Sequence, residues 1–327
     1  MYILNNKQPA KIESITFFEL GMKESDIEEI LRQNVDMICD DEESMLIVGQ
    51  QVKNELRGRS DLTAIDNNGD LVLIEIKRDK ADIVSRKEAF EFQAIRYAAS
   101  CATIKSDDEL IQDIFAPYVE KHKGEFQAYA GLTTTEIAKR VLTEFLNANG
   151  ITSGAFNTKQ RIILVASEFD EQTLSAVAWL NSNQVDMSCY QICPYKIGDN
   201  ICIDMKKILP VADYDDFYVA VAKKIGIQRD RNKDITRRSL PKIDALIDWG
   251  IVKAGDIIQA KCADAEAILQ QDGSVKTDCG DVLSMQQWLK GVYGWSSVQT
   301  YAFAVDKKTG KTLMALREEY MLNQENQ

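Results

Sequence analysis

The sequence predicts an α/β fold in which helices flank a mixed sheet, followed by a small α+β domain. Two observations support this prediction. Through residues 1–210, short apolar runs rich in β-branched side chains alternate with longer segments of helical periodicity. A second pattern of helices and strands occupies residues 236–320, and a charged linker at 211–235 separates the two. A chain of 327 residues is long enough for two domains of this kind.

The first elements of the α/β domain lead up to its central strands. We expect a short strand or arm within residues 1–22, and then a helix over 25–39 that Ser25 or Asp26 caps. The apolar run MLIVGQQV at 45–52 predicts the strand before the centre of the sheet.

Residues 58–77 predict a β-hairpin. The dipeptide Asn68-Gly69 favours a tight turn, because both residues tolerate a positive φ. Residues 61–65 precede this turn and the run LVLIEIK at 71–77 follows it. The second run is apolar on both faces as far as Glu75, which is typical of a buried central strand.

Three ionisable side chains lie at the end of this hairpin. Glu75 and Lys77 are two residues apart and therefore project from one face of their strand, and the hairpin brings Asp61 beside them. Burial of such groups is costly unless they are paired or bind a metal. Two carboxylates and a lysine at a strand end can hold a hard divalent cation and activate a water molecule. The alternative is a structural cluster of ion pairs.

The remaining elements complete the first domain. We expect a helix over 82–104 and a long helical region over 107–149 that breaks near Pro117 and Gly131. The run RIILVAS at 161–167 predicts a buried strand, and residues 169–183 predict a helix. Two strands within 187–210, with a Gly-Asp-Asn turn between them, follow.

This hairpin and its neighbours resemble the PD-(D/E)XK nucleases, the family with the restriction-endonuclease-like fold. Asp61, a gap of thirteen residues and then Glu75-Ile76-Lys77 are similar to the core motif of that family. Gln93 and Tyr97 resemble the Gln-x-x-x-Tyr motif of one of its branches, and SDIEEILRQNVDMI at 25–38 resembles its first helix. The proline of the family name is absent, since Ser60 precedes Asp61.

The resemblance implies an endonuclease, dependent on Mg²⁺ or Mn²⁺, that hydrolyses phosphodiester bonds in DNA. Its role would lie in restriction, repair or defence. Asp61, Glu75 and the main-chain carbonyl of Ile76 would bind the metal. Lys77 would orient or deprotonate the attacking water and offset charge on the phosphorus.

The resemblance also implies roles for residues around this core. Gln93 and a glutamate of the first helix, Glu28 or alternatively Glu29, would complete the site. Arg57 and Arg59 flank the hairpin and would contact phosphate. Tyr97 is expected to pack rather than to take part in catalysis.

Residues 236–320 predict, in order, a helix, two strands with an Asp272-Gly273 turn, a helix, and two strands with a Lys-Thr-Gly turn. This region resembles the RAMA domain, a small module attached to restriction and DNA-methylation proteins. The resemblance implies a domain that reads DNA and is sensitive to base modification. Trp249 and Trp295 are expected to pack rather than to form a cage for a base. The residues that carry the resemblance are LIDWGIVKAGD at 246–256, DGSV at 272–275, Leu283-Ser284, VYGW at 292–295 and KTL at 311–313.

Charge is unevenly distributed along the chain. The net charge is −12, which by itself opposes nucleic acid as a partner. Residues 223–242, however, hold eight basic and two acidic residues. An acidic metal-binding domain beside a basic segment is compatible with DNA as the partner, because the basic side chains can hold phosphates. The candidate DNA contacts in this segment are Lys223, Lys224, Arg237 and Arg238.

Composition excludes several other classes of protein. A single histidine, His122, argues against a Ser-His-Asp triad and against histidine-based metal sites. Seven cysteines without a zinc-binding spacing predict reduced thiols and a cytoplasmic location. No apolar run is long enough for a membrane helix, and the first residues do not read as a signal peptide, so no membrane association is expected.

Two alternatives to an active nuclease remain open at this point. In the first, the nuclease-like domain is a catalytically silent scaffold for DNA binding. In the second, the protein is a subunit that needs a partner nuclease or helicase. The sequence leaves the oligomeric state open, with a homodimer as one alternative.

Overall fold

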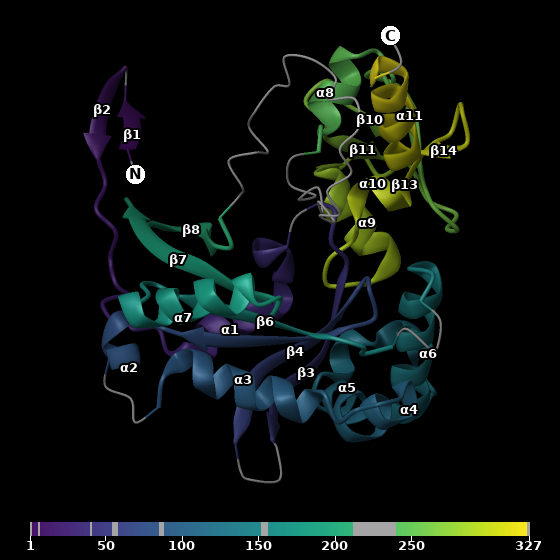
Figure 1. The fold of residues 1–327 in the computed structure, drawn as a ribbon. Coiled ribbons are helices and arrows are strands. Elements are labelled where there is room, and N and C mark those ends of the chain that lie inside the picture. The colour runs from purple at the N-terminus through teal and green to yellow at the C-terminus, as the bar shows by residue number, and fades with distance from the viewer. Residues whose placement is uncertain are drawn as a thin grey trace. The chain divides into compact units, whose positions relative to one another are not determined.

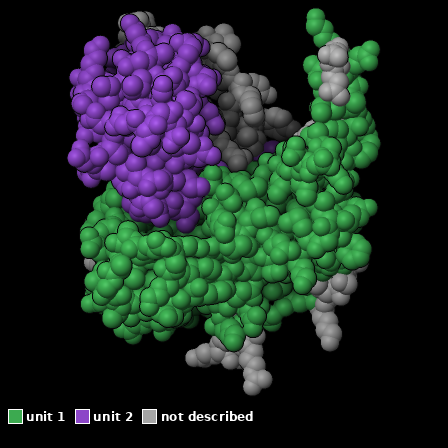
Figure 2. Space-filling view, turned by 180° about the vertical axis from the view of Figure 1, so that it is seen from behind, with its two compact units in different colours: residues 1–38, 45–210 green, residues 39–44, 211–327 purple. Residues whose placement is uncertain are grey.

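The computed structural model describes residues 2–5, 7–39, 41–53, 58–84, 88–151, 156–211 and 240–325. Figure 1 labels most of its helices and strands. The chain forms two compact units (Figure 2): unit 1 is Met1–Ile38 with Met45–Pro210, and unit 2 is Cys39–Ser44 with Val211–Gln327. Most of the expected basic linker lies outside the described residues, and so do four of the candidate DNA contacts, Lys223, Lys224, Arg237 and Arg238.

Unit 1 is built on a six-stranded mixed sheet in the order β3-β4-β5-β6-β7-β8, which confirms the α/β prediction (Figure 1). β3, β4 and β5 are antiparallel neighbours, β6 and β7 run parallel to β5, and β8 returns antiparallel to β7. The strand bounds are Met45–Lys53 (β3), Arg59–Asp66 (β4), Leu71–Lys77 (β5), Gln160–Ala166 (β6), Met187–Ile197 (β7) and Asn200–Leu209 (β8).

The predicted hairpin forms between β4 and β5, and every residue of β5 is buried. Gly69 has the positive φ that the turn requires, at +82°. Asp66 stabilises the turn, because its Oδ1 accepts hydrogen bonds from the main-chain amides of Asn68 at 2.8 Å and Asp70 at 3.1 Å. The buried strand therefore ends in a turn that its own residues fix.

A bulge in β3 shifts the register of the sheet edge. Between Ile47 and Gly49, the pairing of β3 with β4 slips by one residue. A Cβ atom on Gly49 would lie 2.6 Å from a methyl carbon of Val52 and 2.7 Å from one of Ile114. Only glycine therefore fits at the bulge without displacement of its neighbours.

Helices α3 (Phe90–Cys101) and α7 (Glu171–Ser182) pack on the sheet and contact each other. Two successive right-handed β-α-β crossovers that advance in the same direction along a sheet place their helices on the same face, so a contact between them is expected. Helix α1 (Glu24–Gln33) contacts β4 and β5. The other elements of unit 1 are β1 (Tyr2–Asn5), β2 (Gln8–Lys11), η1 (Val35–Ile38), α2 (Lys80–Val84), α4 (Asp107–Leu110), the π-helical turn η2 (Ile111–Phe115), α5 (Ala116–Lys121), η3 (Lys123–Glu125), η4 (Gln127–Tyr129) and α6 (Thr134–Ala148).

Three predicted details of these helices are wrong. The helix expected over 82–104 is two helices, α2 and α3. The N-cap of α1 is Lys23, and Asp26 instead accepts a hydrogen bond from the Lys23 amide at 2.7 Å. The break expected at Pro117 is absent. Pro117 lies in the first turn of α5, directly after the π-helical turn η2, and a first turn tolerates the missing N–H of proline. The break near Gly131 does occur, between α5 and α6.

Unit 2 contains a second six-stranded sheet, which is antiparallel and has the order β12-β11-β10-β9-β13-β14. Four strands were expected and six are present. The final expected strand is mainly the helix α11, because it is rich in Leu, Met, Ala, Arg and Glu, which favour helix. The bounds are α8 (Ile243–Asp248), β9 (Ile257–Ala260), β10 (Glu266–Leu269), β11 (Val275–Thr277), β12 (Val282–Leu283), α9 (Met285–Tyr293), α10 (Thr300–Phe303), β13 (Ala304–Asp306), β14 (Lys311–Thr312) and α11 (Leu313–Glu325).

Two tryptophans of unit 2 pack against other rings. Trp295 is buried, with its ring centroid 4.8 Å from that of Tyr293 and 5.2 Å from that of Phe303. Trp249 is half-buried and stacks on Tyr320 at 4.5 Å. Both therefore serve in packing, as predicted.

The segment 39–44, which precedes β3 in the chain, belongs to unit 2. Its Glu42 forms an ion pair with Arg317 at 2.7 Å, and both side chains are at least 95% buried. The Arg317 guanidinium also lies 4.7 Å from the ring centroid of Tyr301. Three further hydrogen bonds hold the segment: Thr300 N to Asp41 O at 2.7 Å, Ser297 Oγ to Glu43 O at 3.0 Å, and Gln299 N to Ser44 Oγ at 2.7 Å.

The helices of both units are short. The longest one described, α6, has 15 residues. Among the described parts of the chain, no helix is both long and apolar enough to cross a membrane.

We predict that Glu42→Ala destabilises unit 2 by about 3–5 kcal/mol, because it leaves a buried guanidinium without its counter-ion. Chemical unfolding followed by tryptophan fluorescence measures this, since three of the four tryptophans, Trp249, Trp288 and Trp295, lie in unit 2. The control is Lys242→Ala, which removes the exposed pair with Asp41 and should cost about 0–1 kcal/mol. Equal losses in the two variants would contradict the structural role of Glu42.

Candidate active site

Three sequence-predicted residues meet at adjoining ends of β4 and β5. Asp61 is 7% exposed, Lys77 3% and Glu75 not at all. The Asp61 amide donates a hydrogen bond to Glu75 Oε1 at 3.3 Å, and the Ile76 amide donates to Asp61 Oδ2 at 2.8 Å. The apolar hairpin thus holds two carboxylates and an ammonium group in one buried cluster.

The ammonium group of Lys77 lies among oxygen atoms. Its Nζ donates to Glu24 Oε1 at 2.8 Å and to the carbonyl oxygen of Ile76 at 2.5 Å. It is 3.9 Å from Asp61 Oδ2, and 5.6 Å from the ring centroid of Phe90. Lys77 is therefore fixed from several sides, with one contact on the carbonyl that was expected to bind a metal.

Helix α1 presents two glutamates to this cluster, one turn apart. Glu24 binds Lys77, and Glu28, which is buried, lies beside Asp61. Gln51 on β3 joins the two elements, since its Nε2 is 2.5 Å from Glu28 Oε2 and 3.3 Å from Asp61 Oδ1. Residues four apart share a helix face, which explains why both glutamates reach the site.

Glu29, the alternative to Glu28, belongs to a different cluster. Its carboxylate accepts two hydrogen bonds from Arg32, at 2.7 and 2.8 Å. These bonds lower the pKa of Glu29 to about 2. Arg32 also binds Glu125 at 2.7 Å and the Tyr118 hydroxyl at 2.8 Å. The structure thus turns Glu28 toward Asp61 and Glu29 toward Arg32.

Helix α3 closes the site on the side of Glu75. Gln93 Nε2 is 3.4 Å from Glu75 Oε2 and 3.4 Å from the Tyr97 hydroxyl. That hydroxyl accepts a hydrogen bond from the Arg59 amide at 3.0 Å. Tyr97 therefore links α3 to the start of β4. The Arg59 side chain is exposed, whereas Arg57 lies outside the described residues.

Burial makes ionisation of these carboxyl groups costly. Desolvation, and then the adjacent Asp61 carboxylate, raise the pKa of Glu75 to about 9. Desolvation also raises the pKa of Asp61, to about 6, although Lys77 opposes this shift. For Glu28, burial and then Asp61 raise the pKa, while the hydrogen bond from Gln51 lowers it. When these three carboxyl groups ionise, their negative charge exceeds the positive charge of Lys77, and a further cation would offset the excess.

The donor set fits a hard divalent cation. Two carboxylates and a main-chain carbonyl offer only oxygen ligands, the type that Mg²⁺ and Mn²⁺ prefer. In the described residues, no three His, Cys, Asp or Glu side chains are already grouped as a metal site. The observation in favour of the fit is the geometry: two buried carboxylates share one cluster with a single ammonium group, Lys77, so a bound cation would lower the cost of ionising both.

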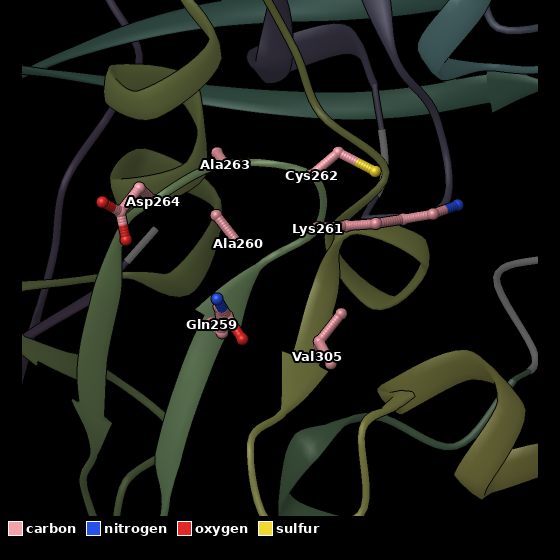
Figure 3. Close-up of a pocket in the computed structure, with 7 residues that line it drawn as sticks. All are labelled: Gln259, Ala260, Lys261, Cys262, Ala263, Asp264 and Val305. Atoms are coloured by element: carbon pink, nitrogen blue, oxygen red, sulfur yellow. The ribbon is translucent and has the colours of Figure 1, made fainter.

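Two hollows on the described surface are lined by residues other than these carboxylates. An open hollow of about 360 Å³ surrounds the β9–β10 turn of unit 2, where Figure 3 shows Lys261 and Asp264 pointing in different directions. A hollow of about 760 Å³ in unit 1 is lined by Lys80, Phe90 and several acidic side chains, which disfavours phosphate.

Sequence reasoning missed two residues of the site, Glu24 and Gln51. Glu24 had a signal, since it is one helical turn before Glu28. No sequence signal pointed to Gln51, because its position opposite Asp61 depends on the bulge in β3.

We predict that the metal-free protein loses stability as pH rises from about 5 to 9. The unfolded chain has released both protons in this range, whereas the folded protein holds the Asp61 proton up to about pH 6 and the Glu75 proton up to about pH 9, so each rise in pH favours unfolding. Melting temperatures between pH 5 and 9, with chelator present, measure this. Glu75→Gln should flatten the dependence, and an unchanged slope in that variant would show that other groups cause it.

Comparisons of this chain with models of protein families, with curated proteins and with solved structures found no match.

Proposed function

We propose that this protein is a metal-dependent endodeoxyribonuclease of the PD-(D/E)XK type. The observation that carries the proposal is the buried cluster of Asp61, Glu75 and Lys77 at the ends of β4 and β5. Burial of three ionisable groups at one end of an apolar hairpin costs free energy. A catalytic role accounts for that cost better than a structural one, because apolar residues would pack at the same positions without it.

Asp61, Glu75 and the Ile76 carbonyl would hold a Mg²⁺ or Mn²⁺ ion. When bound, such an ion acts as a Lewis acid on the phosphate and lowers the pKa of a coordinated water. Lys77 is within reach of the same oxygen atoms, so it would orient or deprotonate the attacking water and offset charge on the phosphorus.

The surrounding residues would orient this core and the DNA. Gln93 supports the Glu75 carboxylate, and Glu28 lies beside Asp61. The exposed guanidinium of Arg59 would contact a phosphate.

We further propose that unit 2 is a RAMA-like domain that also binds DNA. Base modification would change the affinity of this binding. The support is the basic segment 223–242 and the resemblance of residues 246–313. A cytoplasmic location agrees with seven free cysteines. A role in restriction, repair or defence and a homodimeric state are parts of the same proposal.

We expect the purified protein to cleave plasmid DNA with Mg²⁺ or Mn²⁺ and to leave 5′-phosphate and 3′-hydroxyl ends. Glu75→Gln should abolish cleavage. Lys77→Ala should lower the single-turnover rate about 10²–10⁴-fold while DNA binding is retained. Lys77→Arg should not restore the rate, since Arg does not release a proton.

The matched control for Lys77 is Lys80→Ala, because Lys80 is an exposed lysine paired with Glu168. It should cleave as the wild type does. Wild-type rates in Lys77→Ala would exclude the catalytic role of Lys77. If the protein binds DNA but does not cleave it with either Mg²⁺ or Mn²⁺, the alternative of a catalytically silent scaffold would be favoured.

We also predict that replacing Lys223, Lys224, Arg237 and Arg238 together by Gln weakens DNA binding and its dependence on salt. If all four contact phosphates, the slope of log K against log salt should fall by roughly 3–4. Fluorescence anisotropy at several salt concentrations measures this, on matched methylated and unmethylated duplexes. An unchanged slope would remove this segment from the DNA interface, and equal affinities for both duplexes would make unit 2 a general DNA clamp.

A further inference from the structure

Gln51 combines a strained backbone with two contacts in the candidate site. Its φ is +55°, a left-handed conformation inside the strand Met45–Lys53 that non-glycine residues rarely adopt. Such strain persists only where the surroundings impose it, and it concentrates at functional sites. The contacts of the side chain indicate which function it serves.

The side-chain amide of Gln51 bridges two carboxylates from different elements. Its Nε2 carries two hydrogens, and it lies 2.5 Å from Glu28 Oε2 on α1 and 3.3 Å from Asp61 Oδ1 on β4. Its Oε1 faces the other way and accepts from Arg59 Nη1 at 3.4 Å. The amide is thus oriented, with its donors on the carboxylates and its acceptor on a cation.

The bulge in β3 makes this placement possible. Beyond the bulge Gln50 pairs with Leu62 and Val52 with Ser60, so Gln51 stands opposite Asp61. Without the extra residue, Gln50 would occupy that position. Opposite residues of a strand pair project from one face, which explains the direction of the Gln51 side chain.

Gln50 shows what the neighbouring position does instead. Its Oε1 accepts from Lys121 Nζ at 2.6 Å and lies 2.9 Å from a ring nitrogen of His122. Gln50 Nε2 also lies 3.5 Å from Glu29 Oε2, and the Gln50 side chain hydrogen-bonds Glu28. Of the two adjacent glutamines, Gln51 is the one that bridges Glu28 and Asp61.

We propose that Gln51 is a positioning residue that holds the Glu28 and Asp61 carboxylates in the arrangement the metal requires. Two adjacent carboxylates repel each other, and Glu28 has the longer, more mobile side chain, so a shared donor keeps it beside Asp61. Hydrogen bonds of this kind to metal ligands are typically worth about 10–100-fold in metal affinity. The inference rests on the proposed function, because it assumes that Asp61 binds a metal.

The test uses the full chain and Mn²⁺ alone as the probe, by isothermal titration calorimetry without DNA. The main variant is Gln51→Gly, because glycine adopts the left-handed backbone without strain and only the side chain is lost. We expect Mn²⁺ affinity to fall about 10–100-fold while the melting temperature of the metal-free protein stays equal or rises. Gln160→Ala is the matched control, because Gln160 is a half-buried glutamine at the start of β6 whose side chain donates to Asn157, and it should bind Mn²⁺ as the wild type does.

The outcomes separate this inference from the proposed function. Wild-type Mn²⁺ affinity in Gln51→Gly would overturn the role of Gln51, whether or not the protein cleaves DNA. A lower melting temperature with equal loss of affinity in both variants would overturn it as well, since the effect would then be structural. Selective loss in Gln51→Gly, in a protein that cleaves no DNA, would uphold the role of Gln51 and refute the nuclease. A wild type that binds no Mn²⁺ would refute both.

Discussion

The cost of burying charge at the end of β5 is the constraint on which the site depends. Glu75 is fully buried, and its two nearest donors, the Asp61 amide and Gln93 Nε2, are 3.3 and 3.4 Å away. An unbalanced carboxylate in such a place must hold a proton or meet a cation. The neighbouring elements reduce this cost in part: β5 brings the Lys77 ammonium, while α3 and β4 bring neutral hydrogen-bond donors, Gln93 and the Asp61 amide.

The fold positions these groups by simple periodicities. The alternation of side chains along β5 puts Glu75 and Lys77 on one face, and the Asp66–Asp70 turn fixes which residue of β4 stands beside them. Helix α1 adds Glu24 and Glu28 because they are one turn apart. Both strands and helices therefore contribute side chains to the site, and the strand pairing fixes where the strand residues stand.

Those parts of the fold and of the site that depend on neighbouring residues could be predicted from the sequence, and those that depend on distant residues could not. Asn68-Gly69 and the run LVLIEIK carry a local signal, so the hairpin and its three ionisable residues followed from the sequence alone. Gln51 did not, because one inserted residue in β3 reverses which glutamine faces Asp61. The strand expected after the Lys-Thr-Gly turn is short, because β14 covers only Lys311–Thr312 and the helix-favouring residues after it form α11. The inclusion of 39–44 in unit 2 had no local signal, since it rests on contacts with residues about 255–275 positions later.

The inclusion of residues 39–44 in unit 2 sets an order of events during synthesis. Glu42 and Arg317 are 275 residues apart, so at about 5–20 residues per second roughly 15–55 s pass between their appearance on the ribosome. The six strands of the mixed sheet of unit 1 are all present by Leu209, and this sheet can form during the interval. The segment 39–44 meanwhile is a loop whose partners do not yet exist. The contacts of unit 2 with residues 39–44 therefore form only after residues 297–317 have been synthesised.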